Sequence, residues 1–148
     1  WLGEHLYNPN LWHLSRRSAA RAFAIGLFCA FLPIPGQMVV AAFLALWLGG
    51  NLAVSVGLVW LTNPITMPPI FFSTYKLGAW ILGSQPVEVH WSIAGIEAQI
   101  AAIWWPLLFG SVLCGILFSG IGYTVINRLW IWHVQNNRKR ALKRRLKS

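Results

Sequence analysis

Apolar residues fall into three long stretches along the chain, and proline-containing turns interrupt the first two. Residues 22–50 are broken by Pro33-Ile34-Pro35-Gly36, and residues 52–83 are broken where the sequence reads TNPIT, at 62–66. Proline lacks the amide hydrogen and clashes with the preceding helical turn, so each stretch is predicted to form two half-helices. A half-helix of about 11 to 13 residues is roughly 16 to 20 Å long and reaches only about halfway through a bilayer core of about 30 Å.

The second stretch is predicted to restart as a half-helix at Met67. Thr66 is a preferred N-cap residue, and the prolines behind it fall in the first turn, where missing amide donors cost little. The residues assigned to structural helix breaks are Pro33, Pro35, Gly36, Pro64, Pro68 and Pro69.

The two broken stretches also resemble each other. Paired interrupted segments are typical of transporters built from internal repeats, although chance similarity between short apolar runs is the alternative. When the two stretches are aligned at an offset of 33 residues, three positions are identical: Pro35 with Pro68, Trp47 with Trp80, and Gly50 with Gly83.

The third stretch, residues 100–126, is apolar without interruption and predicts one long helix. From Trp104 to Trp130 is 26 steps, which is about 39 Å of helix and matches the spacing of the two interfacial aromatic belts. Small residues recur in it at every fourth position, which allows close helix contact within the molecule or in a homo-oligomer. These candidate packing residues are Ser111, Gly115 and Ser119.

The amino-acid composition indicates whether these helices are surrounded by water or by lipid. Of the 148 residues, 57% are apolar and 10% are charged, whereas soluble domains typically have about 25% charged residues. We therefore predict an all-α integral membrane protein, with two Pro/Gly-broken segments, one of them re-entrant, followed by one long transmembrane helix. Residues 1–21 are expected to be an interfacial N-terminal segment, 22–134 the membrane domain and 135–148 a basic tail. The chain starts at Trp1, so further residues are expected upstream.

The basic residues set the predicted orientation. Three arginines precede the apolar region and eight basic residues follow Ile126, whereas the loop 84–99 has no Lys or Arg. By the positive-inside rule the loop faces away from the cytoplasm and the C-terminus is cytoplasmic. Either 22–50 is then a re-entrant hairpin and 52–83 a broken crossing, or the reverse. With a net charge of +9, the expected counter-charge is anionic lipid headgroups rather than nucleic acid, because the stretch between the flanks is so apolar.

The helix starts supply the candidate chemistry. A half-helix that begins inside a membrane presents unpaired amide hydrogens and a partial positive charge, so the starts at Gln37 and Met67 are expected to attract an anion. Alternatively, Gln37, Asn63 and Thr66 only satisfy the broken backbone, and Lys76 extends to the membrane surface. The candidate anionic-ligand residues are Gly36, Gln37, Thr62, Asn63, Thr66 and Lys76.

Other chemistry is not expected. The chain has no Asp, its three Glu residues lie outside the apolar spans, and its four His residues show no ligand spacing. Cys29 and Cys114 form no CxxC pair and are expected to be small packing residues. We therefore predict no enzyme activity, no metal site and no cofactor.

The broken stretches also carry a family resemblance. The segment GLFCAFLPIPGQMVVAAFLALWL, followed by NLAVSVGLVWLTNPITMPPIFFSTYKLGAWILG, resembles the bacterial membrane family known only as domain of unknown function 2062. The resemblance covers about residues 8–134 and implies a protein of the bacterial inner membrane, but no activity. A more distant likeness is to DedA-type membrane proteins, which are associated with moving polyprenyl-phosphate and other lipids. Those proteins typically have an acidic residue after their Pro-Gly break, where this chain has Gln37.

Two functions are consistent with these observations. In the first, the paired helix breaks bind, or also translocate, an anionic amphiphile such as a phospholipid. In the second, the breaks are structural and the protein is a non-transporting accessory or scaffold subunit of a larger membrane complex. Its partners would then dock on the Trp-rich flanks and the basic tail.

Overall fold

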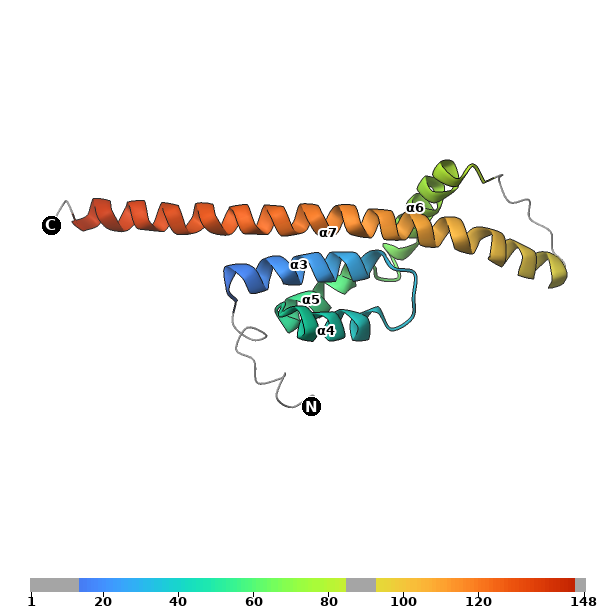
Figure 1. Cartoon of the computed structure of the whole chain (residues 1–148), viewed down its shortest axis with the longest axis horizontal. Helices are drawn as coiled ribbons and strands as arrows, with labels where there is room; N and C mark the ends of the chain where they lie inside the picture. Colours follow the sequence, from blue (N-terminus) through green and yellow to red (C-terminus); the bar gives the residue numbers. More distant parts are fainter. Residues whose placement is uncertain (1–13, 85–92, 146–148) are drawn as a thin grey trace.

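The computed structural model describes residues 14–84 and 93–145, with side chains for 14–84, 100 and 102–140. These residues form helices and connecting turns, with no strand in the described part, so the all-α prediction is confirmed there. Three short helical arms pack together beside one stretch of a very long helix, and a fourth helix crosses it (Figure 1). The elements are α3 (Arg16–Phe31), α4 (Gln37–Leu48), α5 (Leu52–Leu58), η1 (Val59–Leu61), α6 (Met67–Leu82) and α7 (Ile93–Arg145).

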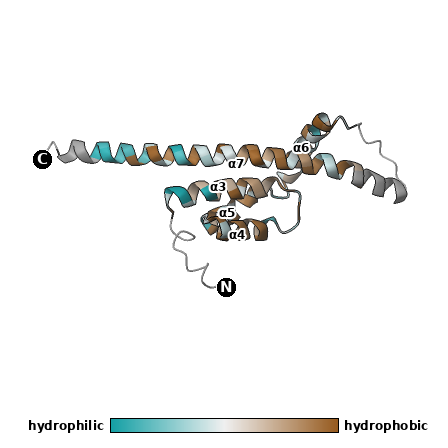
Figure 2. Cartoon of the chain, in the orientation of Figure 1, coloured by the Kyte–Doolittle hydropathy of each residue, from teal (hydrophilic) through white to brown (hydrophobic). Residues whose placement is uncertain are grey.

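The long helix α7 contains the third apolar stretch. It is 53 residues long and carries Pro106 in its interior. Within the described part of the chain it is the one helix long and apolar enough to cross a membrane, over Ala102–Arg140. Figure 2 shows that its residues change from mainly hydrophobic to mainly hydrophilic toward the C-terminal end. The prediction of one long apolar helix is confirmed, and α7 runs on unbroken through the expected boundary at 134/135.

Helices α3 and α4 form an antiparallel hairpin whose two ends lie side by side. The Ser15 side chain caps α3 by accepting a hydrogen bond from the Ser18 amide at 3.1 Å. At this same open end of the hairpin, the Arg21 guanidinium donates to the Leu48 carbonyl at 2.9 Å, and the Asn51 amide donates to the Ser18 carbonyl at 3.2 Å. The chain from 16 to 48 therefore runs out along α3 and returns along α4 (Figure 1).

The third arm, α5 with η1, runs alongside α3 in the same direction. Asn51 caps α5 by accepting from the Val54 amide at 3.0 Å. A Cβ added at Gly26 would lie 2.6 Å from the Leu58 Cβ, so a larger residue there would separate the two arms. At the end of η1 the Thr62 hydroxyl donates to the Ala30 carbonyl at 2.5 Å.

Helix α6 leaves this bundle and packs on α7 instead. It ends at Gly83, which has a left-handed φ of 63°. The corresponding C-cap of α4 is Gly49, with φ 67°, and not Gly50, which the offset of 33 places over Gly83. The two broken stretches thus differ both in what they pack against and in where their glycines end a helix.

The expected N-terminal boundary falls inside a helix. α3 begins at Arg16 and runs without a break to Phe31, so residues 16–21 form its first turns. The remainder of that predicted segment, 1–13, lies outside the described residues, as does 85–92 of the predicted loop 84–99. Residues 93–99 of that loop belong to α7.

The interior is built from small and polar side chains. The largest fully buried side chains include those of Thr74, Ser55 and Ser111, together with Cys29. Large apolar side chains lie outside: Trp80 is 80% exposed and Trp47 is 73% exposed. This distribution is the reverse of that in a water-soluble domain, where large apolar side chains are buried and polar ones cover the surface.

Candidate functional site

The first helix break is a turn between α3 and α4. α3 ends at Phe31, just before the PIPG sequence, and Gly36 adopts a left-handed φ of 79° as the N-cap of α4. A left-handed residue favours glycine because it has no Cβ to clash. The Gln37 side-chain amide donates to the Leu32 carbonyl, which ties the start of α4 back to the end of α3.

The start of α4 leaves amide donors unpaired. The Val39 and Val40 amides both donate to the Gly36 carbonyl, at 2.9 and 3.2 Å. The Gln37 and Met38 amides have no hydrogen-bond partner among the described residues, and Gly36 has no side chain to cap them. This helix start therefore keeps two backbone donors that an anion could accept from.

The second break is bonded internally. The Asn63 side-chain oxygen accepts from the Ile65 and Thr66 amides at 2.9 and 3.0 Å. The Thr66 hydroxyl accepts from the Asn63 amide at 2.9 Å and donates to the Leu61 carbonyl at 2.5 Å. Thr66 is the N-cap residue of α6, as expected, but its side chain makes no capping hydrogen bond because its hydroxyl is directed into the preceding turn.

The start of α6 offers no equivalent donors. The Met67 amide donates to the Asn63 carbonyl at 2.7 Å, and the Ile70 amide donates to the Thr66 carbonyl at 3.1 Å. Pro68 and Pro69 have no amide hydrogen. Only the helix dipole is left to attract an anion at Met67, so the two breaks are not equivalent as anion sites.

One hydrogen bond connects the regions of the two breaks. Thr62 is only 8% exposed, and its hydroxyl reaches the Ala30 carbonyl two residues before the first break. That carbonyl lies in the last turn of α3, where helical acceptors lack intrahelical donors. The Thr62 hydroxyl thus gives a backbone carbonyl of the first broken stretch a hydrogen-bond donor. This is one of the two roles considered for the polar residues of the breaks.

Lys76 lies away from both helix starts. It is nine positions beyond Met67 in α6, which is about 13 Å along the helix axis. Its side chain is exposed, and the ammonium nitrogen lies 4.7 Å from the ring centroid of Phe72 on the same helix. The described contacts therefore do not place Lys76 with Gln37, Asn63 or Thr66.

The candidate packing residues lie on two different faces of α7. Ser111 is fully buried and donates to the Thr74 hydroxyl of α6 at 3.1 Å. Gly115 instead faces α3, where a Cβ would lie 3.1 Å from the Phe28 ring. Ser119 is half-buried.

The closest helix contact uses two glycines that the sequence analysis did not single out. A Cβ on Gly78 would lie well under 3.0 Å from the Pro106 carbonyl oxygen, and a Cβ on Gly110 equally close to the Thr74 carbonyl oxygen. Backbone therefore meets backbone where α6 crosses α7. The sequence does contain a signal for this contact. Thr74 and Gly78 are small residues spaced four positions apart, which is typical of closely packed membrane helices, and Gly110 and Ser111 are adjacent small residues in the third apolar stretch.

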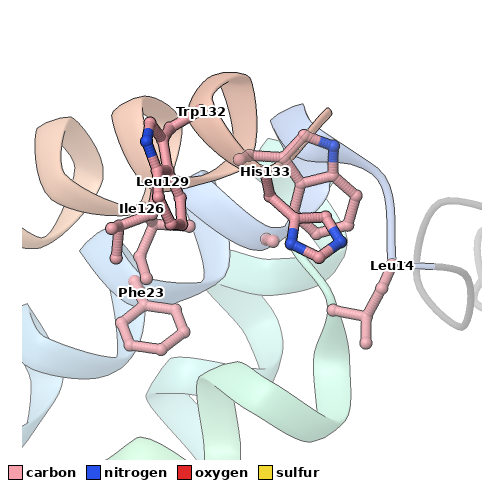
Figure 3. Close-up of a pocket in the computed structure, with 8 residues that line it drawn as sticks. Leu14, Phe23, Ile126, Leu129, Trp132 and His133 are labelled. Atoms are coloured by element: carbon pink, nitrogen blue, oxygen red, sulfur yellow. The ribbon is translucent and has the colours of Figure 1, made fainter. Parts of the chain in front are cut away.

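A cleft that the sequence analysis missed lies between α3 and α7. It has a volume of about 530 Å³ and is almost entirely apolar. Figure 3 shows the side chains that line it from α7 and from the start of α3. They include Leu14, Phe23, Ile126, Leu129, Trp132 and His133. A second cavity of about 360 Å³ is lined by Arg16, Arg138 and Trp130, and Trp130 also lines the first, so the two are adjacent.

With this geometry established, comparison with known protein families is informative. The model of the family described as an uncharacterized protein conserved in bacteria (DUF2062) matches residues 1–139. The chain belongs to the DUF2062 family. The match confirms the resemblance seen in the sequence, and it covers both helix breaks and the cleft. No curated protein and no solved structure gives a significant match.

For this DUF2062 chain the predicted ligand residues divide into three groups. Gly36 and Gln37 lie at the first break, where unpaired amides remain. Thr62, Asn63 and Thr66 lie together at the second break, and each has hydrogen-bond partners in the described structure. Lys76 stands apart on α6. Of the two helix breaks, only the first keeps backbone donors available to a ligand.

Proposed function

We propose that this DUF2062 protein is an integral, multi-pass protein of the bacterial inner membrane. The observation that carries the proposal is the reversed distribution of side chains. Most buried side chains are those of serine, threonine, cysteine and alanine, while Phe43, Trp47, Trp80 and Trp105 are between 65% and 80% exposed. A water-exposed surface of this kind would aggregate, whereas lipid solvates large apolar side chains and small residues allow helices to approach closely.

The geometry favours one of the two layouts left open by the sequence. Both ends of the α3–α4 hairpin lie together, joined by the Arg21–Leu48 and Asn51–Ser18 hydrogen bonds. The start of α3 also lies beside the basic end of α7, since Arg16 and Arg138 line one cavity. In the proposed topology α3–α4 is therefore a re-entrant hairpin from the cytoplasmic side. The segment α5–α6 is then the broken crossing, and the C-terminus is cytoplasmic.

Cysteine labelling tests this topology. In a Cys29→Ala, Cys114→Ala background, single cysteines at Leu48, Ser84 and Ser148 would be treated with a membrane-impermeant maleimide in intact spheroplasts. We expect labelling of the Ser84 position alone, with the other two becoming reactive in inverted vesicles. Labelling of the Leu48 position from the periplasm would support the reverse layout, in which 22–50 crosses. Labelling of all three from outside would overturn the topology.

Within this membrane protein, we propose that the first break binds the headgroup of an anionic amphiphile. The proposal is supported by the unpaired Gln37 and Met38 amides, by the α4 dipole and by the absence of an acidic group among the described side chains. Unsatisfied backbone groups cost several kcal/mol in a membrane interior, so water or an anion should accept from them. Relative to the sequence-based expectation, the second break and Lys76 are no longer part of the site.

A proline substitution tests the headgroup site. Met38→Pro removes one of the two unpaired donors and reproduces the first turn of α6, where Pro68 follows Met67 without loss of the helix. We expect weaker binding of an anionic phospholipid to purified protein by native mass spectrometry, with unchanged helix content by circular dichroism. The matched control is Asn63→Ala, which we expect to affect stability rather than headgroup preference. Unchanged lipid binding in Met38→Pro would contradict the site.

The second candidate function is an accessory or scaffold subunit, and one observation favours it. The polar groups of the second break already satisfy their own backbone, as expected for a structural turn. In this case a stoichiometric protein partner would copurify in mild detergent, and Met38→Pro would leave the bound lipid unchanged.

A further inference from the structure

The cleft between α3 and α7 has an apolar part and a cationic part. The apolar part is lined by side chains such as Leu14, Phe23 and Leu129. The adjoining cavity is lined by Arg16 and Arg138, and Trp130 lines both cavities. A volume of about 530 Å³ falls within the range of roughly 300 to 1,000 Å³ that small-molecule sites occupy.

The two arginines have no counter-charge among the described side chains, because none of those side chains is acidic. The guanidinium groups of Arg16 and Arg138 also make no hydrogen bond within the described part of the chain. Arg21, by contrast, is engaged with the Leu48 carbonyl. A guanidinium presents a planar array of donors that matches a phosphate group, so two free ones at one cavity fit an anionic phosphate.

We infer that this cleft binds one anionic phospholipid of the cytoplasmic leaflet. The phosphate lies at Arg16 and Arg138, and an acyl chain follows the apolar surface of Phe23 and Leu129. The inference rests on the proposed membrane location, because the cleft lies where α3 and α7 change from apolar to basic, the depth of the headgroups (Figure 2). The site is separate from the first helix break, which follows the opposite end of α3.

The antiparallel pairing of α3 with α7 creates the site. Basic residues at 16 and 138 are far apart in the sequence, and they meet because the first turns of α3 lie against the last apolar turns of α7. A lipid bound there would bridge the hairpin to the long helix, and it would supply the negative charge that the described side chains lack.

Native mass spectrometry of the purified full chain tests the inference. Binding of phosphatidylglycerol would be compared with that of phosphatidylcholine for the wild type and for the exposed double variant Arg16→Gln, Arg138→Gln. Because charge-assisted hydrogen bonds from a guanidinium to a phosphate are stronger than neutral ones, we expect the variant to bind the first phosphatidylglycerol at least about tenfold more weakly than the wild type does. The control is Arg17→Gln, Lys139→Gln, which changes the net charge equally at positions that line neither cavity.

Three outcomes are informative. A loss confined to the Arg16, Arg138 variant supports the site. An equal loss of phosphatidylglycerol binding in both double variants would mean diffuse attraction to basic residues, and it would overturn the inference. Unchanged phosphatidylglycerol binding in both would also overturn it, because the cleft would then be occupied by a protein segment or a partner. The Met38→Pro variant separates the two sites. Lipid binding that depends on Arg16 and Arg138 should persist in Met38→Pro alone, and it should be lost when Met38→Pro is combined with the double arginine variant. Failure of the labelling experiment would instead remove the proposed membrane topology.

Discussion

Where α6 crosses α7, backbone meets backbone, whereas α3 lies along α7 with side chains between the two helices. At the crossing, Gly78 and Gly110 face the carbonyl groups of Pro106 and Thr74 with no room for a Cβ. Along α3, the Phe31 and Phe118 rings stack at 4.9 Å, and the nearest atoms to Gly115 and Gly122 of α7 belong to the side chains of Phe28 and Leu27.

The two contacts therefore differ in how they can adjust. Side chains change rotamer at modest cost, but a backbone carbonyl moves only if its helix moves. The α3–α7 contact can accordingly tolerate a gap at its basic end, which is where the cleft lies. The α6–α7 crossing has one geometry. We expect the crossing to hold the fold rigidly and the α3 contact to accommodate a ligand.

The largest effect is expected for Gly110→Ala. The new methyl would clash with the Thr74 carbonyl and with the Gly78 amide nitrogen, at 2.9 Å, and neither is a flexible side chain. We expect destabilisation at or above the upper end of the ~1–3 kcal/mol range for overpacked sites. The measurement is reversible unfolding of the purified protein in mixed micelles.

A glycine elsewhere on α7 is the matched control. Gly120 has nothing within 4 Å of an added Cβ. Gly120→Ala should be neutral or slightly stabilising, by up to about 1 kcal/mol, because alanine has the higher helix propensity. If Gly110→Ala were as harmless as Gly120→Ala, the close crossing of α6 and α7 would be wrong.

A smaller effect is expected for Gly122→Ala, on the α3 side of α7. The nearest atom to the new methyl is the Leu27 Cδ1, at 2.5 Å, and the next lie at 3.8 Å. Leu27 can turn away, so we expect a cost of about 1 kcal/mol, comparable with an off-rotamer side chain.

A second substitution sharpens this comparison. Leu27→Ala removes the clashing atom, so Gly122→Ala should cost almost nothing in that background, and the two changes should show a coupling energy. No side-chain truncation can rescue Gly110→Ala in the same way, because the atoms it meets are backbone. A Gly122→Ala effect that Leu27→Ala does not relieve would show that the α3 contact is as rigid as the crossing.

The sequence predicted those features that depend on local rules. Two prolines and a glycine within four residues, at Pro33, Pro35 and Gly36, strongly disfavour a helix, and α3 does end at Phe31 before them. α4 begins at Gln37 and α6 at Met67, the positions where half-helices were expected to start. The unbroken apolar run after residue 100 likewise gave the one long apolar helix, α7.

Features that depend on which surfaces meet were not accessible in the same way. Ser111 lies next to Gly110, but α7 presents small residues on several faces, and only the fold selects the face that α6 covers. The Thr62 bond to Ala30 joins residues 32 positions apart, so the sequence could not decide whether Thr62 serves a ligand or the backbone. The cleft was missed for the same reason, since its walls come from both ends of the chain.

The smallest effect is expected for the polar pair inside the crossing, Ser111 and Thr74. The Ser111 hydroxyl donates to the Thr74 hydroxyl at 3.1 Å, and Thr74 in turn donates to the Phe71 carbonyl at 3.0 Å. Ser111→Ala therefore removes one hydrogen bond and leaves Thr74 with a partner. Side-chain hydrogen bonds between membrane helices average about 0.6 kcal/mol, so we expect a double-mutant cycle of Ser111→Ala and Thr74→Val to give a coupling energy near that value. A coupling above about 2 kcal/mol would mean that the polar pair, and not the fit of two glycine backbones, holds α6 against α7.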